Sequence, residues 1–202
     1  MTDDALLDAA EVYARERLSE GRYAHTLRVA DTAERLSELH GLDPEKARLA
    51  ALLHDTAREM GKEELLRVAK EEGIATSELE REQPLLLHGP VAAELARKDL
   101  GVEDGEVLEA MRAHTTGEPG MGHLSLALYV ADKIEPDRDQ PGVEGLRKLA
   151  LESLRRAAMV ALEGSISHNE QRGRPIHPKS LKTLEWLEDY YGGELHPGES
   201  EV

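Results

Sequence analysis

The sequence predicts an all-α protein, and three observations lead to this fold class. Phe is absent, aromatic residues make up 3% of the chain, and Leu and Ala supply most of the apolar side chains. Strands favour β-branched and aromatic residues, whereas Leu and Ala are strong helix formers. Apolar residues also recur with helical spacing in successive segments, and Gly or Pro separates these segments.

Nine helices are expected, and most of them begin or end at a residue that favours a helix terminus. Their ranges are 3–19, 22–39, 44–58, 63–72, 84–100, 104–116, 123–134, 143–172 and 178–191. Gly41 ends the second helix, and Asp43 with Pro44 provides an N-cap and a first-turn proline for the third. Gly117 ends the sixth, and the segment 143–172 either continues or breaks near Leu151.

The remaining boundaries depend on the same types of residue. Gly21 separates the first two helices, Gly73 ends the fourth, and the fifth and ninth begin at Pro84 and Pro178. The loop GEPGMG precedes the seventh helix, and the turn-rich run EPDRDQPG follows it. Residues 74–83 have no clear pattern.

No repeat, low-complexity segment or linker divides the chain, so one domain is expected over residues 1–192. Residues 193–202, GELHPGESEV, have no apolar pattern and are expected to be disordered.

The charge balance excludes several classes of partner. The chain has 41 acidic and 25 basic residues, which gives a formal charge of −16. Such a balance argues against binding to a nucleic acid polymer or to an anionic membrane surface. A small phosphorylated ligand stays allowed, because bound metal ions can supply positive charge locally.

Localisation follows from what the sequence lacks. There is no cysteine, so disulfides and thiolate sites are impossible. The N-terminal residues do not resemble a secretory signal, and there is no apolar stretch of about 18 residues that could span a membrane. We expect a cytoplasmic protein.

Six side chains of metal-binding type lie in segments that should face the core. They are His25, His54, Asp55, His88, His114 and Asp132. Burying unpaired carboxylates and imidazoles is costly, and a bound divalent metal removes that cost. Nitrogen and oxygen donors without thiolates suit Fe, Mn, Co or Zn. The alternative is a chance gathering of core polar residues, whereas the joint pattern favours a metal centre on which several helices converge.

The other histidines have different surroundings. His40 lies beside a helix-ending glycine, His123 follows a loop glycine, and His168, His177 and His196 lie in polar or Pro-rich sequence. These five are interpreted as structural or surface residues.

The order of these residues resembles a known family. His25, the pair His54-Asp55 and Asp132 match the H…HD…D pattern of HD-domain metal-dependent phosphohydrolases, which are helical bundles, and His88 and His114 match the members that hold two metals. The runs ALLHDTAR, HGPVAAE, HTTG, ADKIEPDRDQPGVEGLR and GRPIHPKSL resemble more closely the YqeK family of symmetrical diadenosine tetraphosphate hydrolases. This resemblance covers residues 22–187.

The resemblance implies a role for each of the six side chains. His25, His54 and Asp132 would hold one metal, His88 and His114 would hold the second, and Asp55 would bridge both. Iron is the metal that the family suggests, with manganese or cobalt as alternatives. Asp55 and Arg58 are the expected catalytic residues, and the expected substrate contacts are Arg22, Arg58, Thr115, Lys133, Arg138 and Arg147.

Two positions depart from the family pattern. Arg58 stands where the family usually has Lys, and a guanidinium binds phosphate well but is a poor proton donor near neutral pH. Lys133 stands where an aromatic residue is common, which puts stacking of a base at that position in doubt.

The resemblance implies a hydrolase that cleaves diadenosine tetraphosphate to two ADP by a metal-activated hydroxide. An HD-domain hydrolase acting on a nucleotide monophosphate, a dNTP or a cyclic dinucleotide stays open as an alternative. A nucleotide-binding sensor with weak catalysis is a further alternative, which Arg58 keeps open. The expected partner is a small nucleotide, and the expected assembly is a homodimer.

Overall fold

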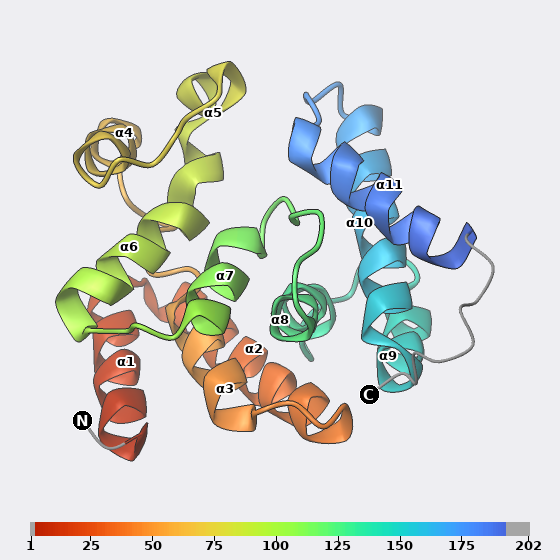
Figure 1. The fold of residues 1–202 in the computed structure, drawn as a ribbon, viewed down its shortest axis with the longest axis horizontal. Helices are drawn as coiled ribbons and strands as arrows, with labels where there is room; N and C mark the ends of the chain where they lie inside the picture. Colours follow the sequence, from red (N-terminus) through yellow and green to blue (C-terminus); the bar gives the residue numbers. More distant parts are fainter. Residues whose placement is uncertain (1–2, 193–202) are drawn as a thin grey trace.

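The computed structural model describes residues 3–192, and this part of the chain contains helices and no strand. The helices are α1 (Asp3–Arg17), α2 (Glu20–Leu39), α3 (Pro44–Leu53), α4 (Lys62–Glu71), α5 (Glu78–Glu82), the 3-10 helix η1 (Pro84–Leu87), α6 (His88–Leu100), α7 (Gly105–Ala113), α8 (His123–Ile134), α9 (Val143–Glu152), α10 (Leu154–Gln171) and α11 (Pro178–Gly192). Figure 1 shows their arrangement. The predicted all-α class is confirmed, and the predicted tail at 193–202 lies outside the described residues.

Side chains fix several helix starts. The Asp43 carboxylate accepts hydrogen bonds from the first backbone amides of α3, and Asp104 does the same for α7. Ser77 forms a capping box with Glu80, which makes α5 a short helix within the segment whose sequence is ambiguous. Ser153 caps α10, so the segment 143–172 breaks at Ser153, near Leu151 as expected.

Several helix boundaries differ from the predicted ones. α2 begins at Glu20 and so contains Gly21, which was expected to separate the first two helices, and α7 ends at Ala113 rather than at residue 116. The third helix ends at Leu53 instead of continuing to Arg58, because side chains take its last carbonyl groups. The His54 ring bonds to the carbonyl of Ala51, and the Thr56 hydroxyl donates to that of Leu53. Residues 84–100 form no single α-helix, because η1 precedes α6.

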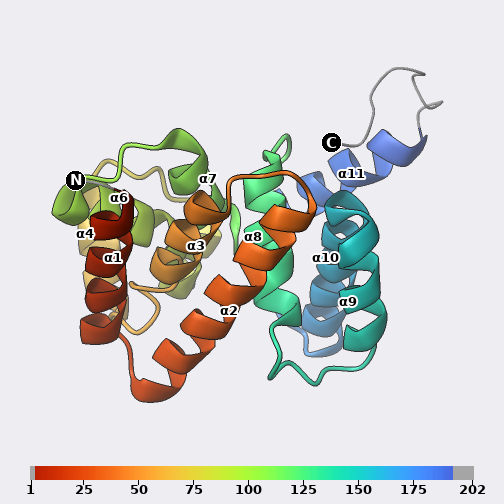
Figure 2. The same ribbon diagram turned by 90° about the horizontal axis from the view of Figure 1, so that it is seen from below.

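The helices pack around one core cluster that extends from α1 to α11. α2 packs against α3 and α8, and α7 packs against α3, α6 and α8. Figure 2 shows α8 in the middle, with α2 and α3 on one side and α9 and α10 on the other. Within residues 3–192, none of the helices combines the length and apolarity needed to cross a bilayer.

Gly89 allows a close approach of α6 to α7. A Cβ atom at this position would lie 2.7 Å from the backbone oxygen of Met111 and 3.0 Å from the ring of His114. A backbone oxygen cannot move aside as a flexible side chain can, so a larger residue would force the two helices apart. The contact therefore couples helix packing to the position of a histidine of the predicted site.

We predict that Gly89→Ala destabilises the protein by about 1–3 kcal/mol, because the added methyl group overpacks this contact. Gly164→Ala is the matched control, since Gly164 lies exposed within α10 with nothing near its Cβ position. That variant should be more stable than the wild type by about 0.5–1 kcal/mol. Urea unfolding of both variants checks the prediction, and equal stabilities would contradict it.

Candidate metal centre

Three of the predicted histidines stand at helix ends, and all three are buried. His54 is the C-cap residue of α3, His114 is that of α7, and His88 lies where η1 passes into α6. The last carbonyl groups of a helix have no partner within the helix. A side-chain donor at such a position can therefore bond to its own helix.

Each of these rings uses that opportunity in the same way. The Nδ1 atoms of His54, His88 and His114 lie 2.5, 2.6 and 2.7 Å from the carbonyl oxygens of the residues three positions earlier. A carbonyl oxygen only accepts, so each Nδ1 carries the proton and each Nε2 has a free lone pair. The rings are thus oriented as metal-binding histidines are in known sites.

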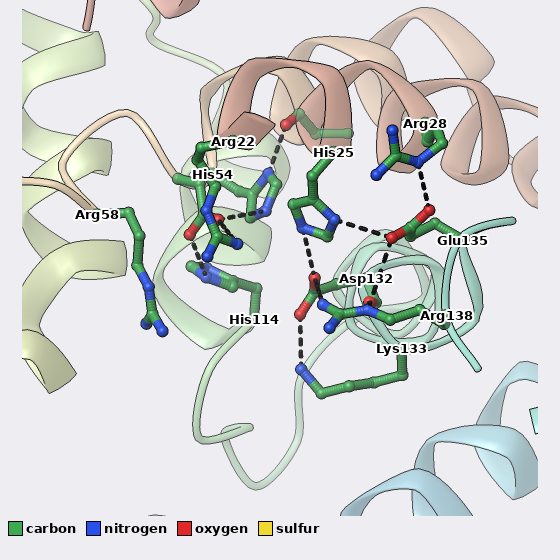
Figure 3. A network of polar contacts seen from close by, with 12 residues as sticks. Arg22, His25, Arg28, His54, Arg58, His114, Asp132, Lys133, Glu135 and Arg138 are labelled. Carbon is green, nitrogen blue, oxygen red and sulfur yellow. Dashed lines mark hydrogen bonds and ion pairs between the residues drawn. The ribbon is translucent and has the colours of Figure 1, made fainter. Parts of the chain in front are cut away.

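His25 needs a different partner, because it lies inside α2, where the helix itself uses the backbone carbonyl groups. Its Nδ1 atom lies 3.1 Å from Oε1 of the buried Glu135, whose other oxygen accepts a 2.7 Å bond from Nε of Arg28. Figure 3 shows His25 between Glu135 and Asp132. Glu135 lies in a motif that carries the resemblance, but no role was predicted for it or for Arg28.

The Nε2 atoms converge on the carboxylate of Asp55. Oδ1 of Asp55 lies 3.1 Å from His88 Nε2 and 3.7 Å from His114 Nε2, and Oδ2 lies 3.5 Å from His54 Nε2. Asp55 thereby belongs to two groups of potential ligand atoms, one with His25 and His54 and one with His88 and His114. We call these five residues the Asp55 cluster.

The Asp55 cluster brings acceptor atoms together without enough donors. The Nε2 atoms of His88 and His114 lie 2.9 Å apart, and the hydroxyl of Thr115 lies 3.3 and 3.1 Å from them and can donate to only one at a time. The Nε2 atoms of His25 and His54 are buried without a hydrogen-bond partner. Such an arrangement fits divalent cations, which lone pairs and a carboxylate would bind together.

Asp132 lies beside the Asp55 cluster and belongs to neither group of ligand atoms. Its Oδ1 atom lies 3.1 Å from Nε2 of His25, although the two are not aligned for a hydrogen bond. Lys133 Nζ lies 2.6 Å from its other oxygen, and Nη2 of Arg138 lies 2.9 Å from Oδ1. Figure 3 shows both cations turned toward this carboxylate.

The other predicted contact residues divide into two sets. Arg22 Nη1 lies 3.2 Å from Asp55, and Arg58 Nη1 lies 3.4 Å from His88, so both guanidinium groups reach the Asp55 cluster. Arg147 does not: its Nε and Nη2 atoms donate to backbone carbonyl groups of residues 134–138, and its Nη1 atom pairs with Glu144. These contacts hold the turn that follows α8.

Burial and charge set the protonation states. Burial lowers the pKa of His54 to about 4 and also lowers the pKa of His114. Burial raises the pKa of Asp55, but the neighbouring imidazoles, first that of His54, bring it well below its usual range. Burial also raises the pKa of Asp132, but Lys133 together with other cations lowers it well below its usual value. Neutral imidazoles and ionised carboxylates are the forms that bind metals.

Comparison with known proteins agrees with this geometry. The model of the HD domain family matches residues 22–137. A protein of Bacillus subtilis strain 168 described as a symmetrical bis(5'-nucleosyl)-tetraphosphatase is 39% identical over 86% of this chain and 92% of its own length. The chain belongs to the YqeK family of HD-domain proteins.

Further members and a solved structure extend this result. A YqeK-family protein of Staphylococcus aureus strain NCTC 8325 with the same description is 37% identical over 71% of this chain and 74% of its own length. A crystal structure from Clostridium acetobutylicum, described as a predicted HD superfamily hydrolase involved in NAD metabolism, superposes with a TM-score of 0.87. It is 36% identical, and the match covers 90% of this chain and 96% of the other.

We predict that acid weakens the metal-free protein through His54. As the pH falls from 6.5 to 4, the unfolded chain takes up this proton before the folded chain does, so the free energy of unfolding falls. The shift corresponds to a loss of about 3 kcal/mol over this range. Urea unfolding of chelator-treated protein at the two pH values measures the loss.

The His54→Gln variant should lose less stability over the same range, because it has no imidazole to protonate at this position. His168→Gln is the control, since His168 lies exposed on α10, and it should behave as the wild type does. The same loss in the wild type and in His54→Gln would refute the assignment.

Proposed function

We propose that the chain hydrolyses diadenosine tetraphosphate symmetrically to two ADP molecules at a two-metal centre. The observation that carries the proposal is the position of Asp55 between two groups of histidine Nε2 atoms. The proposal is supported by the descriptions of the relatives in Bacillus subtilis and Staphylococcus aureus as symmetrical bis(5'-nucleosyl)-tetraphosphatases.

Each metal has a proposed set of ligands. His25, His54 and Asp132 would hold one metal, His88 and His114 would hold the other, and Asp55 would contribute to both. When bound, the two ions would lower the pKa of a coordinated water and offset negative charge on the substrate. We propose iron, the metal that the family resemblance suggests, with manganese or cobalt as alternatives. A donor set of nitrogen and oxygen without thiolate is compatible with each of them.

We propose that Lys133 and Arg138, which pair with Asp132, bind the substrate. Both cations pair with this carboxylate in the structure. If Asp132 held a metal, its ion pairs with Lys133 and Arg138 would weaken, and both side chains could turn to phosphate oxygens of the substrate. Ligand binding by Asp132 and phosphate binding by its two partners would then be coupled.

The replacement of the family's Lys by Arg58 fits this reaction. Water adds to one inner phosphorus, the bond from that phosphorus to the central bridging oxygen breaks, and ADP leaves with that oxygen. The leaving oxygen belongs to a phosphate group, a weak base that departs as an anion, so no side chain has to supply a proton. Arg58 and Arg22 would bind the charged oxygens, and Thr115 would donate a hydrogen bond beside them.

A cytoplasmic location and a homodimeric assembly remain part of the proposal.

We predict that the purified protein contains about two transition-metal ions per chain and forms ADP as the sole product from diadenosine tetraphosphate. Replacing His88 or Asp55 by Ala should lower metal content and hydrolysis together, whereas His168→Ala should change neither. Metal analysis and chromatography of the products measure both. AMP with ATP as products would refute symmetrical cleavage, and preferential hydrolysis of a dNTP or a cyclic dinucleotide would favour another HD-domain activity.

We predict that Glu135→Gln lowers metal affinity by about 10–100-fold, because the amide no longer holds His25 with a negative charge. The matched control is Asp137→Asn, since Asp137 also pairs with Arg28 but does not contact His25. Competition with a chelator measures the affinity independently of activity. Wild-type affinity in the Glu135 variant would show that this carboxylate does not position the histidine.

A further inference from the structure

A cavity of about 270 Å³ adjoins the Asp55 cluster. Arg58 and Thr115 line it and also contact the cluster, so the cavity and the proposed metal centre share a border. In Figure 1 the loop between α7 and α8 rises between α5 on one side and α10 with α11 on the other. Residues from all of these regions except α5 itself line the cavity, together with η1 and the segment before α11.

The lining combines apolar walls with a few polar side chains. Leu86, Leu162 and Ile166 are among the apolar residues, and Asn169 and Arg174 are among the polar ones. Small-molecule sites have this composition, in which apolar walls hold the ligand and a few polar groups orient it. A flat ring with polar edges, such as a nucleobase, matches both parts of the lining.

The charge of the lining points to an anionic ligand. Two arginines, Arg58 and Arg174, and His177 line the cavity, whereas none of its lining residues is Asp or Glu. The lining of the cavity therefore differs from the chain as a whole, whose formal charge is −16. A nucleotide has the required combination of an apolar ring and negative charge.

Several polar groups of the lining lack a partner within the described residues. The amide of Asn169 and the guanidinium of Arg174 form no hydrogen bond or ion pair. His177 is 8% exposed, and its Nδ1 atom accepts a bond from the backbone amide of Lys179, so Nε2 carries the proton. That buried Nε2 has no hydrogen-bond partner, and the nearest carboxylate oxygen, of Glu80, is 3.5 Å away.

Hydrogen bonds fix the part of the cavity wall that carries His177. The hydroxyl of Ser180, at the start of α11, donates to the backbone carbonyl of Thr116. The His177 carbonyl accepts from the backbone amide of Ser180, which fixes the turn that carries His177. His177 therefore lies on a preformed surface, whereas Asn169 is carried by α10 itself and Arg174 is exposed in the segment between α10 and α11.

We propose that this cavity is the subsite for one nucleoside end of the dinucleotide, with Asn169 and Arg174 as its recognition residues. This inference rests on the proposed function, because the phosphate chain would pass from the cavity along Arg58 and Thr115 to the Asp55 cluster. An asparagine amide can pair with the N6 and N7 atoms of adenine. The number of phosphates between the held nucleoside and the cluster would then set the position of cleavage.

The test compares a ligand that carries a nucleoside with an inorganic polyphosphate that has none. Binding of ADP and of inorganic tripolyphosphate to the metal-loaded protein is measured by calorimetry for the wild type, Asn169→Ala and Arg174→Ala. We expect Asn169→Ala to weaken ADP binding by about tenfold, which corresponds to about 1.4 kcal/mol, with unchanged tripolyphosphate binding. Arg174→Ala should weaken ADP binding more than tripolyphosphate binding.

Kinetics with diadenosine tetraphosphate provide the second measurement. The KM value of Asn169→Ala should rise by a similar factor, with kcat and metal content close to those of the wild type. The matched control is His168→Ala, since His168 is the neighbouring exposed residue on α10 and does not line the cavity. It should leave both binding constants and KM unchanged.

The outcomes separate this inference from the proposed function. Unchanged ADP affinity and KM in Asn169→Ala, in a protein that cleaves diadenosine tetraphosphate, would overturn the subsite and leave the function intact. Equal loss of ADP and tripolyphosphate binding would show that the cavity binds phosphate alone, which also overturns it. If the wild type fails to cleave the dinucleotide, the function fails, and the comparison of ADP affinities still decides whether the cavity holds a nucleoside.

Discussion

The hydrogen bond from an imidazole Nδ1 atom to a carbonyl group of its own helix end is the interaction on which the candidate site depends. His54, His88 and His114 all form it with the residue three positions earlier. One bond fixes the tautomer and the ring orientation together, and it satisfies a carbonyl group that the helix leaves free. The site is therefore assembled by the way in which helices end, and the packing of α3, α6 and α7 brings the three ends together.

His25 cannot bond to a carbonyl group of its own helix and is oriented in another way. Because it lies within α2, no free backbone carbonyl group is available to its Nδ1 atom. A carboxylate from the end of α8 accepts the hydrogen bond instead. Burying Glu135 requires a cation in turn, and Arg28, one turn after His25 on the same helix, provides it. The packing of α2 against α8 is thus also an electrostatic contact, and a change in either helix would move the ring.

The sequence predicted that His25, His54, Asp55, His88 and His114 come together, and the structure brings them together. The prediction depended on the joint pattern of several apolar segments that each carry a histidine or an aspartate. The all-α class and the approximate place of most helices followed from composition and spacing. The end of α3 at Leu53 could not be predicted, because side chains at His54 and Thr56 decide it by competing for carbonyl groups. Glu135 was missed since its partner lies 110 positions away, and no local spacing connects the two.

The cavity residues were missed for a related reason. Asn169 lies near the end of α10 and Arg174 lies three residues after it, both in polar sequence, and such residues are usually solvated surface. His177 was interpreted as a structural or surface residue, whereas the structure places it, buried, in the wall beside the Asp55 cluster. Only the folding of α10 against α8, and of α11 against α10 and the segment after α7, brings these side chains near Arg58.

The electrostatics of the site explain how so acidic a chain can accept a polyphosphate. Ion pairs on the surface neutralise many of the acidic side chains, among them Glu94, which pairs with Arg97 and Arg112. Arg22 and Arg58, in contrast, face a buried carboxylate and an imidazole, close to where metal ions would add further positive charge. Fields in a partly buried site are screened less than fields over the surface, so the local arrangement outweighs the total charge.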